Sequence, residues 1–273
     1  MSKEYLSPNL ETKTAAELTV ELLEAHSKLQ SLQKEREMML ANISHDLRAP
    51  ITAIRSAVDL ALSTKNLSDE DIYKTLSLID KRTTVLEDLI NDMYYLFSVE
   101  DISQPLITQS IDACAFLEEY FYDAVIDSRY DNFEMKLDVS HDLKCTIQID
   151  PQKIIRVLDN LMTNSAKYAG DKASFIQLSA GLIQTNNNES PSFLAVSVSD
   201  DGCGIAPEAL PHIFTRTYTV SSARTPDVSS GSGLGLSIAR AIVERHGGTI
   251  SVKSSLGKGT SFTISLPCSY SQS

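Results

Sequence analysis

The first hundred residues carry apolar positions with the period of an α-helix. From Leu18 to Ile43 these positions recur at steps of four and three, with Arg36 as the one polar interruption. This pattern predicts an amphipathic helix with a heptad-like seam, long enough for a coiled coil. A solitary amphipathic helix is the alternative. The coiled coil is favoured because no helix breaker occurs before Pro50. The seam comprises Leu18, Leu22, Ala25, Leu29, Leu32, Met39 and Ile43.

A second helix is predicted after a polar connector at residues 63–68. Pro50 is expected to kink the first helix without ending it, because apolar periodicity resumes directly afterwards. Ser68 and Asp71 are spaced to cap the second helix. Two such helices form an antiparallel hairpin with one apolar side open, and pairing two copies into a dimeric four-helix bundle would cover it. The second seam comprises Ile72, Leu76, Ile79, Thr83, Leu86, Ile90, Met93 and Phe97.

Beyond a linker at residues 100–105 the pattern changes to mixed helix and strand. Asp150 followed by Pro151 is a typical helix start, and Gly247-Gly248 is a typical helix end. Alternating apolar positions predict the strands. Helices are expected at about 113–126, 151–169 and 234–246, and strands at about 133–139, 145–149, 174–183, 193–200, 249–254 and 260–266.

Composition narrows the class of protein. The chain has 273 residues, 42% of them hydrophobic and 22% charged, which is typical of a soluble globular protein of one or two domains. A net charge of -12 argues against a nucleic-acid partner. No apolar run approaches the ~20 residues that cross a bilayer, and no signal pattern is present, so we expect a cytoplasmic chain. The scattered cysteines are expected to be free thiols.

His45, followed by Asp46, is the candidate reactive group of the first helix. The histidine lies two residues from both Ile43 and Leu47 of the apolar stripe. At ~100° per residue it therefore points away from that stripe. An exposed imidazole beside an acid is available for chemistry, whereas a buried one is more often a packing residue.

The helix expected at 151–169 carries a polar strip beside its apolar face. Asn160, Asn164, Lys167 and Tyr168 lie on this strip. Two amides, an ammonium and an aromatic ring could together hold a metal, phosphates and a base. For this helix taken alone, a solvated surface is the better explanation.

Two glycine-rich stretches follow. Asp200-Asp201-Gly202-Cys203-Gly204-Ile205 comes directly after a strand, where glycines let the backbone approach a flat ligand and a carboxylate can accept a hydrogen bond from an exocyclic amine. An ordinary turn is the alternative. Residues 231–236, Gly-Ser-Gly-Leu-Gly-Leu, lead into a helix, and their amides can cradle phosphates. Their spacing differs from the Rossmann and Walker patterns.

Together these stretches resemble the conserved boxes of bacterial sensor histidine kinases. Residues 42–54 resemble the phospho-acceptor box, the Asn160 strip resembles the N-box, and the two glycine stretches match the glycine boxes in the family's order. Residues 213–218 fit the F-box in part, because Thr217 stands where many members carry an aromatic residue. The resemblance implies a HisKA-type dimerisation and phospho-acceptor hairpin, followed by a GHKL-type α/β sandwich also found in gyrase-type ATPases and Hsp90-type chaperones.

The resemblance also implies ATP and Mg²⁺ as cofactors. Asn164 would be the metal ligand, Asn160 would support the phosphate–metal region, Lys167 would meet phosphates, and Tyr168 would stack near the adenine that Asp200 reads. Mg²⁺ suits such a site because it keeps most of its waters and shares substrate phosphates. Phe214 would fold against a lid, and Arg216 or Arg224 would reach the γ-phosphate. The expected nucleotide contacts are completed by Gly202, Gly204, Ile205, Gly231, Gly233, Leu234, Gly235 and Leu236.

The implied reaction is phosphoryl transfer from Mg·ATP to His45, which Asp46 orients, and then to an aspartate of a response regulator. Ala49 stands where members with strong phosphatase activity carry Thr or Asn, so weak phosphatase activity is expected. The alternatives are a non-kinase ATPase of the same fold and a catalytically silent interaction module.

The expected domains are a tail and signalling coiled coil at 1–34, a phospho-acceptor domain at 35–102, a catalytic domain at 103–268 and a tail at 269–273. A homodimer is expected. A membrane-anchored sensor region absent from this chain would make it the cytoplasmic portion of a receptor.

Overall fold

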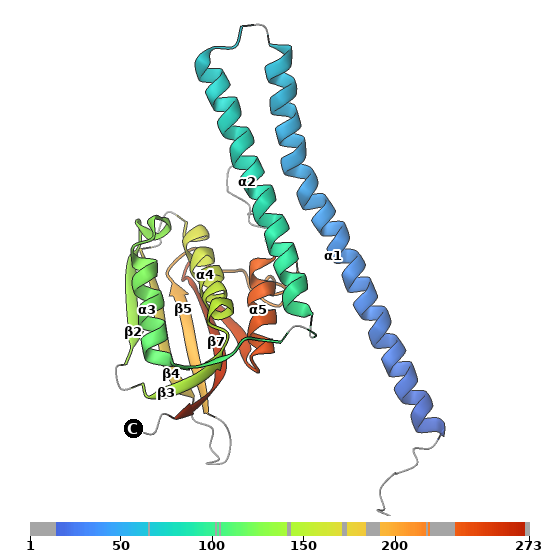
Figure 1. The fold of residues 1–273 in the computed structure, drawn as a ribbon, viewed down its shortest axis with the longest axis vertical. Coiled ribbons are helices and arrows are strands. Elements are labelled where there is room, and N and C mark those ends of the chain that lie inside the picture. Colours follow the sequence, from blue (N-terminus) through green and yellow to red (C-terminus); the bar gives the residue numbers. More distant parts are fainter. Residues whose placement is uncertain are drawn as a thin grey trace, which may run out of the picture. The chain divides into compact units, whose positions relative to one another are not determined.

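The protein is described here from a computed structural model, which covers residues 15–64, 66–101, 103, 105–140, 143–170, 174–183, 192–216, 218 and 233–270 (Figure 1). The chain divides into two compact units, residues 1–49 and 50–273. None of the helices described is long and apolar enough to cross a membrane.

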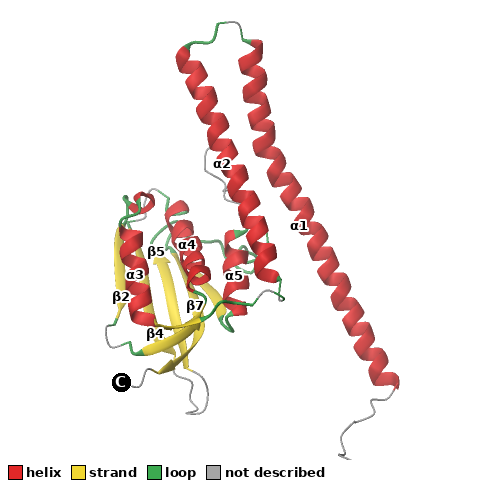
Figure 2. Ribbon diagram, in the orientation of Figure 1, coloured by secondary structure: helices red, strands yellow, loops and turns green. Residues whose placement is uncertain are grey.

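Two long helices form the first part of the chain, α1 (Ala15–Ser63) and α2 (Asp69–Glu100) (Figure 2). Pro50 lies inside α1 and does not end it, as the sequence predicts. Ser68 is the N-cap of α2, and its hydroxyl oxygen accepts the Asp71 amide at 3.1 Å. The predicted cap is therefore confirmed.

Apolar side chains along both helices lie on the surface. Leu22 and Leu29 of α1 are 70% and 65% exposed, and Leu76 of α2 is 60% exposed. Leu96 and Val99 are fully buried at the C-terminal end of α2, where α2 packs against α5 (Gly235–Arg245). Among the other described apolar residues of the two helices, Met39, Ile43 and Leu89 are also buried, at 3–4% exposure. The seams that the sequence predicts are thus largely uncovered within one chain.

The rest of the chain forms one mixed sheet with helices on one face (Figures 1 and 2). Its strand order is β1-β3-β7-β5-β4-β2, and β6 pairs with β7. The β2–β4 pair is parallel, and the other pairs are antiparallel. The strands are β1 (Gln109–Asp112), β2 (Glu134–Val139), β3 (Cys145–Ile149), β4 (Phe175–Ile183), β5 (Ser192–Asp200), β6 (Thr249–Ser254) and β7 (Thr260–Tyr270).

Helices α3 (Ala113–Val125), α4 (Pro151–Lys167) and α5 cover this sheet, and a short 3₁₀ turn, η1 (Ser128–Tyr130), follows α3. The aspartates Asp112 and Asp150 cap α3 and α4 by accepting a backbone amide of the first turn. The core lies between helices and sheet. Its fully buried side chains include Ile147, Ile149, Ile154, Leu158, Leu161, Met162, Ile176, Leu178, Leu194 and Leu234.

Four elements differ from the sequence prediction. β1 and η1 were not expected, because β1 is mostly exposed and has no apolar alternation; it is held by backbone pairing with β3. β7 continues to Tyr270, past the expected end at residue 266, because Ile147 and Cys145 of β3 pair with Cys268 and Tyr270. α4 ends at Lys167, two residues early.

A histidine joins the end of α5 to the start of α4. The Asp150 amide donates to His246 Nε2 at 3.0 Å, and His246 Nδ1 lies 2.7 Å from the Ile242 carbonyl oxygen. The ring must therefore be neutral, with its proton on Nδ1. Burial lowers the pKa of His246 and favours this form. Gly247 ends the helix with a φ of 72°, as its sequence position predicts.

Candidate active site

α4 presents its residues on separate strips. Ile154, Leu158, Leu161 and Ser165 are buried, as predicted for the apolar face. The adjacent polar strip stays accessible, and the Asn160 side-chain amide donates to the Gly235 carbonyl at 3.2 Å. This bond joins α4 to the glycine stretch at the start of α5.

Lys167 and Tyr168 complete that strip at the C-terminal end of α4. The Lys167 ammonium lies 5.4 Å from the centre of the Tyr168 ring. Partial burial lowers the pKa of Lys167, because removal from water disfavours its charged form. An incoming anion would offset that cost, so the ammonium is well suited to a phosphate.

Asp200 lies at the end of β5, where the backbone turns. Its Oδ1 accepts the amides of Gly202 at 2.9 Å and Thr260 at 3.2 Å. Burial raises the pKa of Asp200, and these two hydrogen bonds oppose the rise. A Cβ on Gly202 would lie 2.9 Å from the same Oδ1, so a side chain there would disturb the carboxylate.

Two adjoining cavities gather these groups. One has a volume of about 350 Å³, an apolar wall and a single carboxylate. The other, of about 500 Å³, has polar and apolar surface in about equal parts and carries amide and basic side chains together with the carboxylates of Asp88, Asp92 and Asp159. A flat heterocycle with an exocyclic amine suits the first, and a triphosphate with a hard cation suits the second. Predicted residues lining the first are Asn164, Tyr168, Asp200, Gly204, Ile205 and Leu236, and those lining the second are Asn160, Asn164, Lys167, Tyr168, Gly233, Gly235 and Leu236.

The start of α5 provides backbone donors to the polar cavity. Gly233 has a φ of 66°, and the helix begins at Gly235 without a side-chain cap. The first amides of a helix lack intrahelical partners and favour an anion. Leu234 is fully buried and anchors this turn without lining either cavity. Gly231 lies outside the described residues.

Two of the F-box residues, Ile213 and Tyr218, line both cavities. The Phe214 ring packs edge-on against Phe262, with centroids 6.4 Å apart. Phe214 and Arg216 line neither cavity. Most of the expected lid, including Thr217 and Arg224, lies outside the described residues, so the predicted contacts of Phe214 with the lid and of arginine with a γ-phosphate stay predictions.

His45 is accessible on α1. Its side chain is 71% exposed, and Nδ1 lies 3.3 Å from Asp46 Oδ1. When Asp46 holds Nδ1, the other ring nitrogen, Nε2, is left as the atom that could act as a nucleophile. The exposure expected from the helical stripe is therefore confirmed.

Sequence reasoning missed the role of Asp201. It accepts the amides of Ser174 at 2.8 Å and Phe175 at 3.1 Å, which fastens the start of β4 to the end of β5. Desolvation acts to raise the pKa of Asp201, but hydrogen bonds from the Ser174 hydroxyl and from the Ser174 and Phe175 amides outweigh it and lower the pKa. No motif signals this role, because the partners lie 27 and 26 residues away.

The cysteines behave as expected from their scattered positions. All four are free. Cys203 is exposed between the two glycines of its stretch, and its thiol lies 3.0 Å from the Tyr168 carbonyl oxygen. Within the described residues no cluster of His, Cys, Asp and Glu could hold a metal.

Comparison with known proteins defines the class. Residues 35–102 match the His Kinase A (phospho-acceptor) domain, and residues 149–270 match the histidine kinase-, DNA gyrase B- and HSP90-like ATPase family. The chain is 32% identical over 246 residues to the sensor protein kinase WalK of Staphylococcus aureus, and 30% identical over 240 residues to WalK of Staphylococcus saprophyticus. The chain therefore belongs to the sensor histidine kinases.

These alignments cover 88% of this chain but 55% and 38% of the two relatives. The chain thus spans about half or less of the curated relatives that it matches. Among solved structures, the fold resembles the histidine kinase ThkA in complex with the response regulator protein TrrA, with a TM-score of 0.64 and 22% identity over 88% of this chain and 66% of that one. It also resembles full-length ShkA in complex with AMPPNP, with a TM-score of 0.59 and 22% identity over 89% of this chain and 46% of that one.

Proposed function

We propose that this chain phosphorylates its own His45 from Mg·ATP and passes the phosphoryl group to an aspartate of a response regulator. The observation that carries the proposal is the presence, in one chain, of an accessible His45–Asp46 pair and of paired cavities suited to an adenine nucleotide. Either feature alone would suit another function.

The residues divide the work between binding and reaction. Asp200 accepts a hydrogen bond from the adenine amine, and Tyr168 packs near the base. Lys167 and the amides at the start of α5 hold phosphate oxygens. Bound Mg²⁺ would neutralise developing charge on the phosphates, and Asn164, supported by Asn160, would be its protein ligand. The donor set suits this ion, because a single amide oxygen leaves most positions to water and phosphate.

His45 attacks the γ-phosphorus through Nε2, while Asp46 holds the proton on Nδ1 and fixes the tautomer. The Nε2–P bond forms as the bond to the ADP oxygen breaks. Positioning and charge stabilisation provide most of the acceleration in such transfers.

A homodimer and a response-regulator receiver domain are the proposed partners. The uncovered seams of α1 and α2 support the dimer. The regulator is inferred from family membership and from the fold resemblance to ThkA, whose structure contains one. The expected domain limits, 35–102 and 103–268, and a cytoplasmic location belong to the same proposal. The weak phosphatase activity expected from Ala49 stays a prediction of the sequence.

The test is incubation with Mg²⁺ and γ-labelled ATP. Wild type should acquire an acid-labile, base-stable label, and His45→Gln should lose at least 100-fold of it, because Gln lacks a nucleophilic ring nitrogen. His26→Gln is a matched control on the same helix, since His26 is also exposed. ATP turnover that persists in His45→Gln, without any label in wild type, would instead identify a non-kinase ATPase. Absence of nucleotide binding would identify an interaction module.

A further inference from the structure

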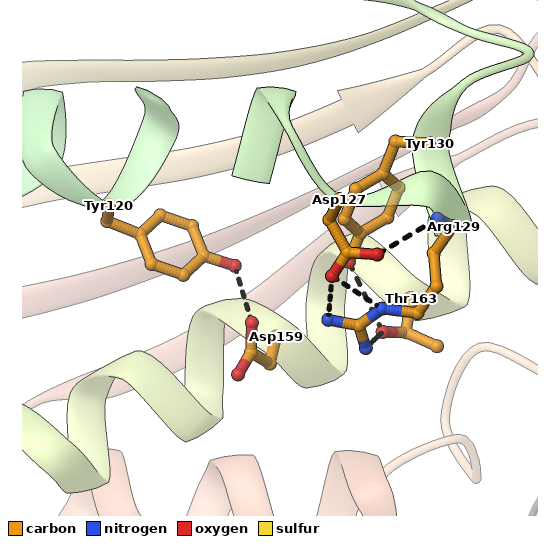
Figure 3. Close-up of polar contacts among 6 residues, drawn as sticks. All are labelled: Tyr120, Asp127, Arg129, Tyr130, Asp159 and Thr163. Carbon is orange, nitrogen blue, oxygen red and sulfur yellow. Dashed lines mark hydrogen bonds and ion pairs between the residues drawn. The ribbon is translucent and has the colours of Figure 1, made fainter. Parts of the chain in front are cut away.

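A third strip on α4 faces away from the sheet and lines the polar cavity beside the two asparagines. Asp159 and Thr163 lie on it, each directly before one of the two site asparagines, Asn160 and Asn164. At ~100° per residue, Asp159 is about a quarter turn from Asn160. Figure 3 shows that Asp159 and Thr163 meet side chains from α3 and η1.

From α3, Tyr120 contacts Asp159. Its hydroxyl donates to Asp159 Oδ1 at 3.1 Å, and the Tyr120 side chain is only 7% exposed (Figure 3). Burial, together with the nearby charge of Asp159, raises the pKa of Tyr120, so the phenol keeps its proton and remains a donor. This is a hydrogen bond to a charged acceptor in a protected setting, which is stronger than a neutral one.

From η1, Arg129 and Tyr130 approach Thr163. The Arg129 Nη1 donates to the Thr163 hydroxyl oxygen at 3.4 Å, and the Tyr130 hydroxyl lies 3.4 Å from the same atom. Asp127 fixes the guanidinium, accepting Nε at 2.8 Å and Nη2 at 2.6 Å (Figure 3). Asp127 Oδ1 also accepts the Arg129 amide at 2.9 Å. The orientation of the arginine is therefore fixed by Asp127 and does not depend on its contact with α4.

We propose that these contacts, from Tyr120 to Asp159 and from Arg129 to Thr163, position Asn160 and Asn164 for the metal and phosphates of Mg·ATP. We call them the α4 brace. This inference rests on the nucleotide role proposed above. Arg129, Asp159 and Thr163 themselves line the polar cavity, whereas Tyr120 does not. In this proposal they are positioning residues, which act through the asparagines that follow Asp159 and Thr163.

The physical reason is that apolar packing alone does not fix the rotation of a helix. The buried strip of α4 is attracted to the sheet without directional preference, whereas hydrogen bonds depend on angle and distance. A side-chain atom about 5–6 Å from the helix axis moves by about 1 Å when the helix rotates by ~10°. A displacement of about 1 Å at a reacting site can lower a rate by up to ~100-fold.

The measurement that tests the brace is the ratio of affinities for ATP with Mg²⁺ and with excess EDTA, obtained from a fluorescent nucleotide analogue. Asn164 contributes only when the metal is present, so a misplaced α4 should reduce this ratio. We expect a reduction of at least about threefold in Tyr120→Phe, which removes one hydroxyl. Tyr122→Phe is the matched control, because Tyr122 lies on the same helix and is 63% exposed; its ratio should equal that of wild type.

Two variants of the acceptor sharpen the test. Asp159→Asn keeps an oxygen for the Tyr120 hydroxyl and should retain the ratio within about twofold, whereas Asp159→Leu should behave like Tyr120→Phe. Thr163→Val removes the hydroxyl that Arg129 and Tyr130 of η1 contact. It provides the test of the brace if Tyr120→Phe does not fold. A lowered melting temperature with an unchanged Mg²⁺ ratio in Tyr120→Phe, Asp159→Leu and Thr163→Val would show a purely structural role and overturn the proposal.

The outcome is distinguishable from failure of the proposed function. The ratio is a binding measurement and does not require transfer to His45. If wild type binds Mg·ATP but acquires no label, the kinase proposal fails while the brace can still be confirmed. If Mg²⁺ does not strengthen ATP binding to wild type, the brace has no site to position and is refuted.

Discussion

The helical hairpin and the α/β region differ in how far their apolar residues are buried. In the α/β region, Leu158, Leu161 and Ile176 are fully buried between helices and sheet. Along α1 and α2, apolar residues that follow an equally regular pattern are exposed, with Leu22 at 70% and Leu76 at 60%. A regular apolar stripe therefore predicts a buried interface. It does not predict whether the surface that covers the stripe belongs to the same chain or to another molecule.

This difference has a functional counterpart. The nucleotide cavities are built from contacts within one chain, such as the bond from Asn160 to Gly235 and those from Gly202 and Thr260 to Asp200. The phospho-acceptor helix carries an accessible histidine and an uncovered seam. The structure thus combines cavities built within one chain, one of them lined also by Asp88, Asn91 and Asp92 of α2, with helices whose apolar residues are largely exposed.

The largest expected effect is on stability, and it tests whether the core of the α/β region is formed by residues of one chain. Leu158→Ala should lower the free energy of unfolding by about 2–5 kcal/mol, because it leaves a cavity beneath α4. The measurement is urea denaturation. Ile126→Ala, at a position that is 83% exposed, is the control and should change the free energy by no more than about 0.5 kcal/mol. Equal effects of the two substitutions would contradict a self-contained core.

A charge on the second seam tests the other half of the comparison. Leu76→Glu should weaken self-association at least tenfold, equivalent to about 1.4 kcal/mol, because a carboxylate would be buried on pairing. Sedimentation at several concentrations measures this association. Nucleotide affinity should stay unchanged.

Ser77→Glu provides the matched control for that substitution. Ser77 is exposed and lies off the apolar stripe of α2, so the same charge is added to the other side of the helix. Self-association that survives Leu76→Glu, or that is lost equally in both variants, would show that the seam is not the dimer surface.

The smallest expected effect concerns the link between α5 and α4. Folding lowers the pKa of His246. At pH values below about 6.5, the ordinary pKa of histidine, the unfolded chain therefore binds more protons than the folded chain. The stabilisation is therefore complete above about pH 6.5 and is lost as pH falls through the lowered value. The slope is at most about 1.4 kcal/mol per pH unit across that window.

Thermal unfolding of wild type and His246→Gln between pH 5 and pH 8 measures this effect. The difference in stability between them should shrink towards the acidic end, because Gln does not titrate. A difference that grows on acidification would mean that the folded protein favours the charged ring.

Local sequence patterns predicted most of the elements and much of the site. The spacing on α4 placed Leu158 and Leu161 inward and Asn160 and Asn164 on the cavity side, since residues three and four apart share a helical face. Short-range hydrogen bonds explain why the caps at Ser68 and Asp150 were also predictable. The exposure of His45 followed from its angle to the apolar stripe.

Features without a local pattern were not predictable. β1 is a mostly exposed strand that depends on backbone pairing with β3, and the extension of β7 to Tyr270 depends on the same neighbour. Asp201 had no role assigned from the sequence, yet it fastens β4 to β5. These roles depend on which strands become neighbours, and the sequence of one strand does not contain that information.

The amino-acid sequence by itself determined the helices, their caps, the accessible His45 and the polar strip of α4, because each depends on side chains within a few positions of one another. Only the tertiary structure decided how α4 is held. The bond from Tyr120 to Asp159 joins residues 39 positions apart, and that from Asp150 to His246 joins residues 96 apart. Such contacts exist only after the sheet has brought its helices together, which is why their residues carry no signal along the chain.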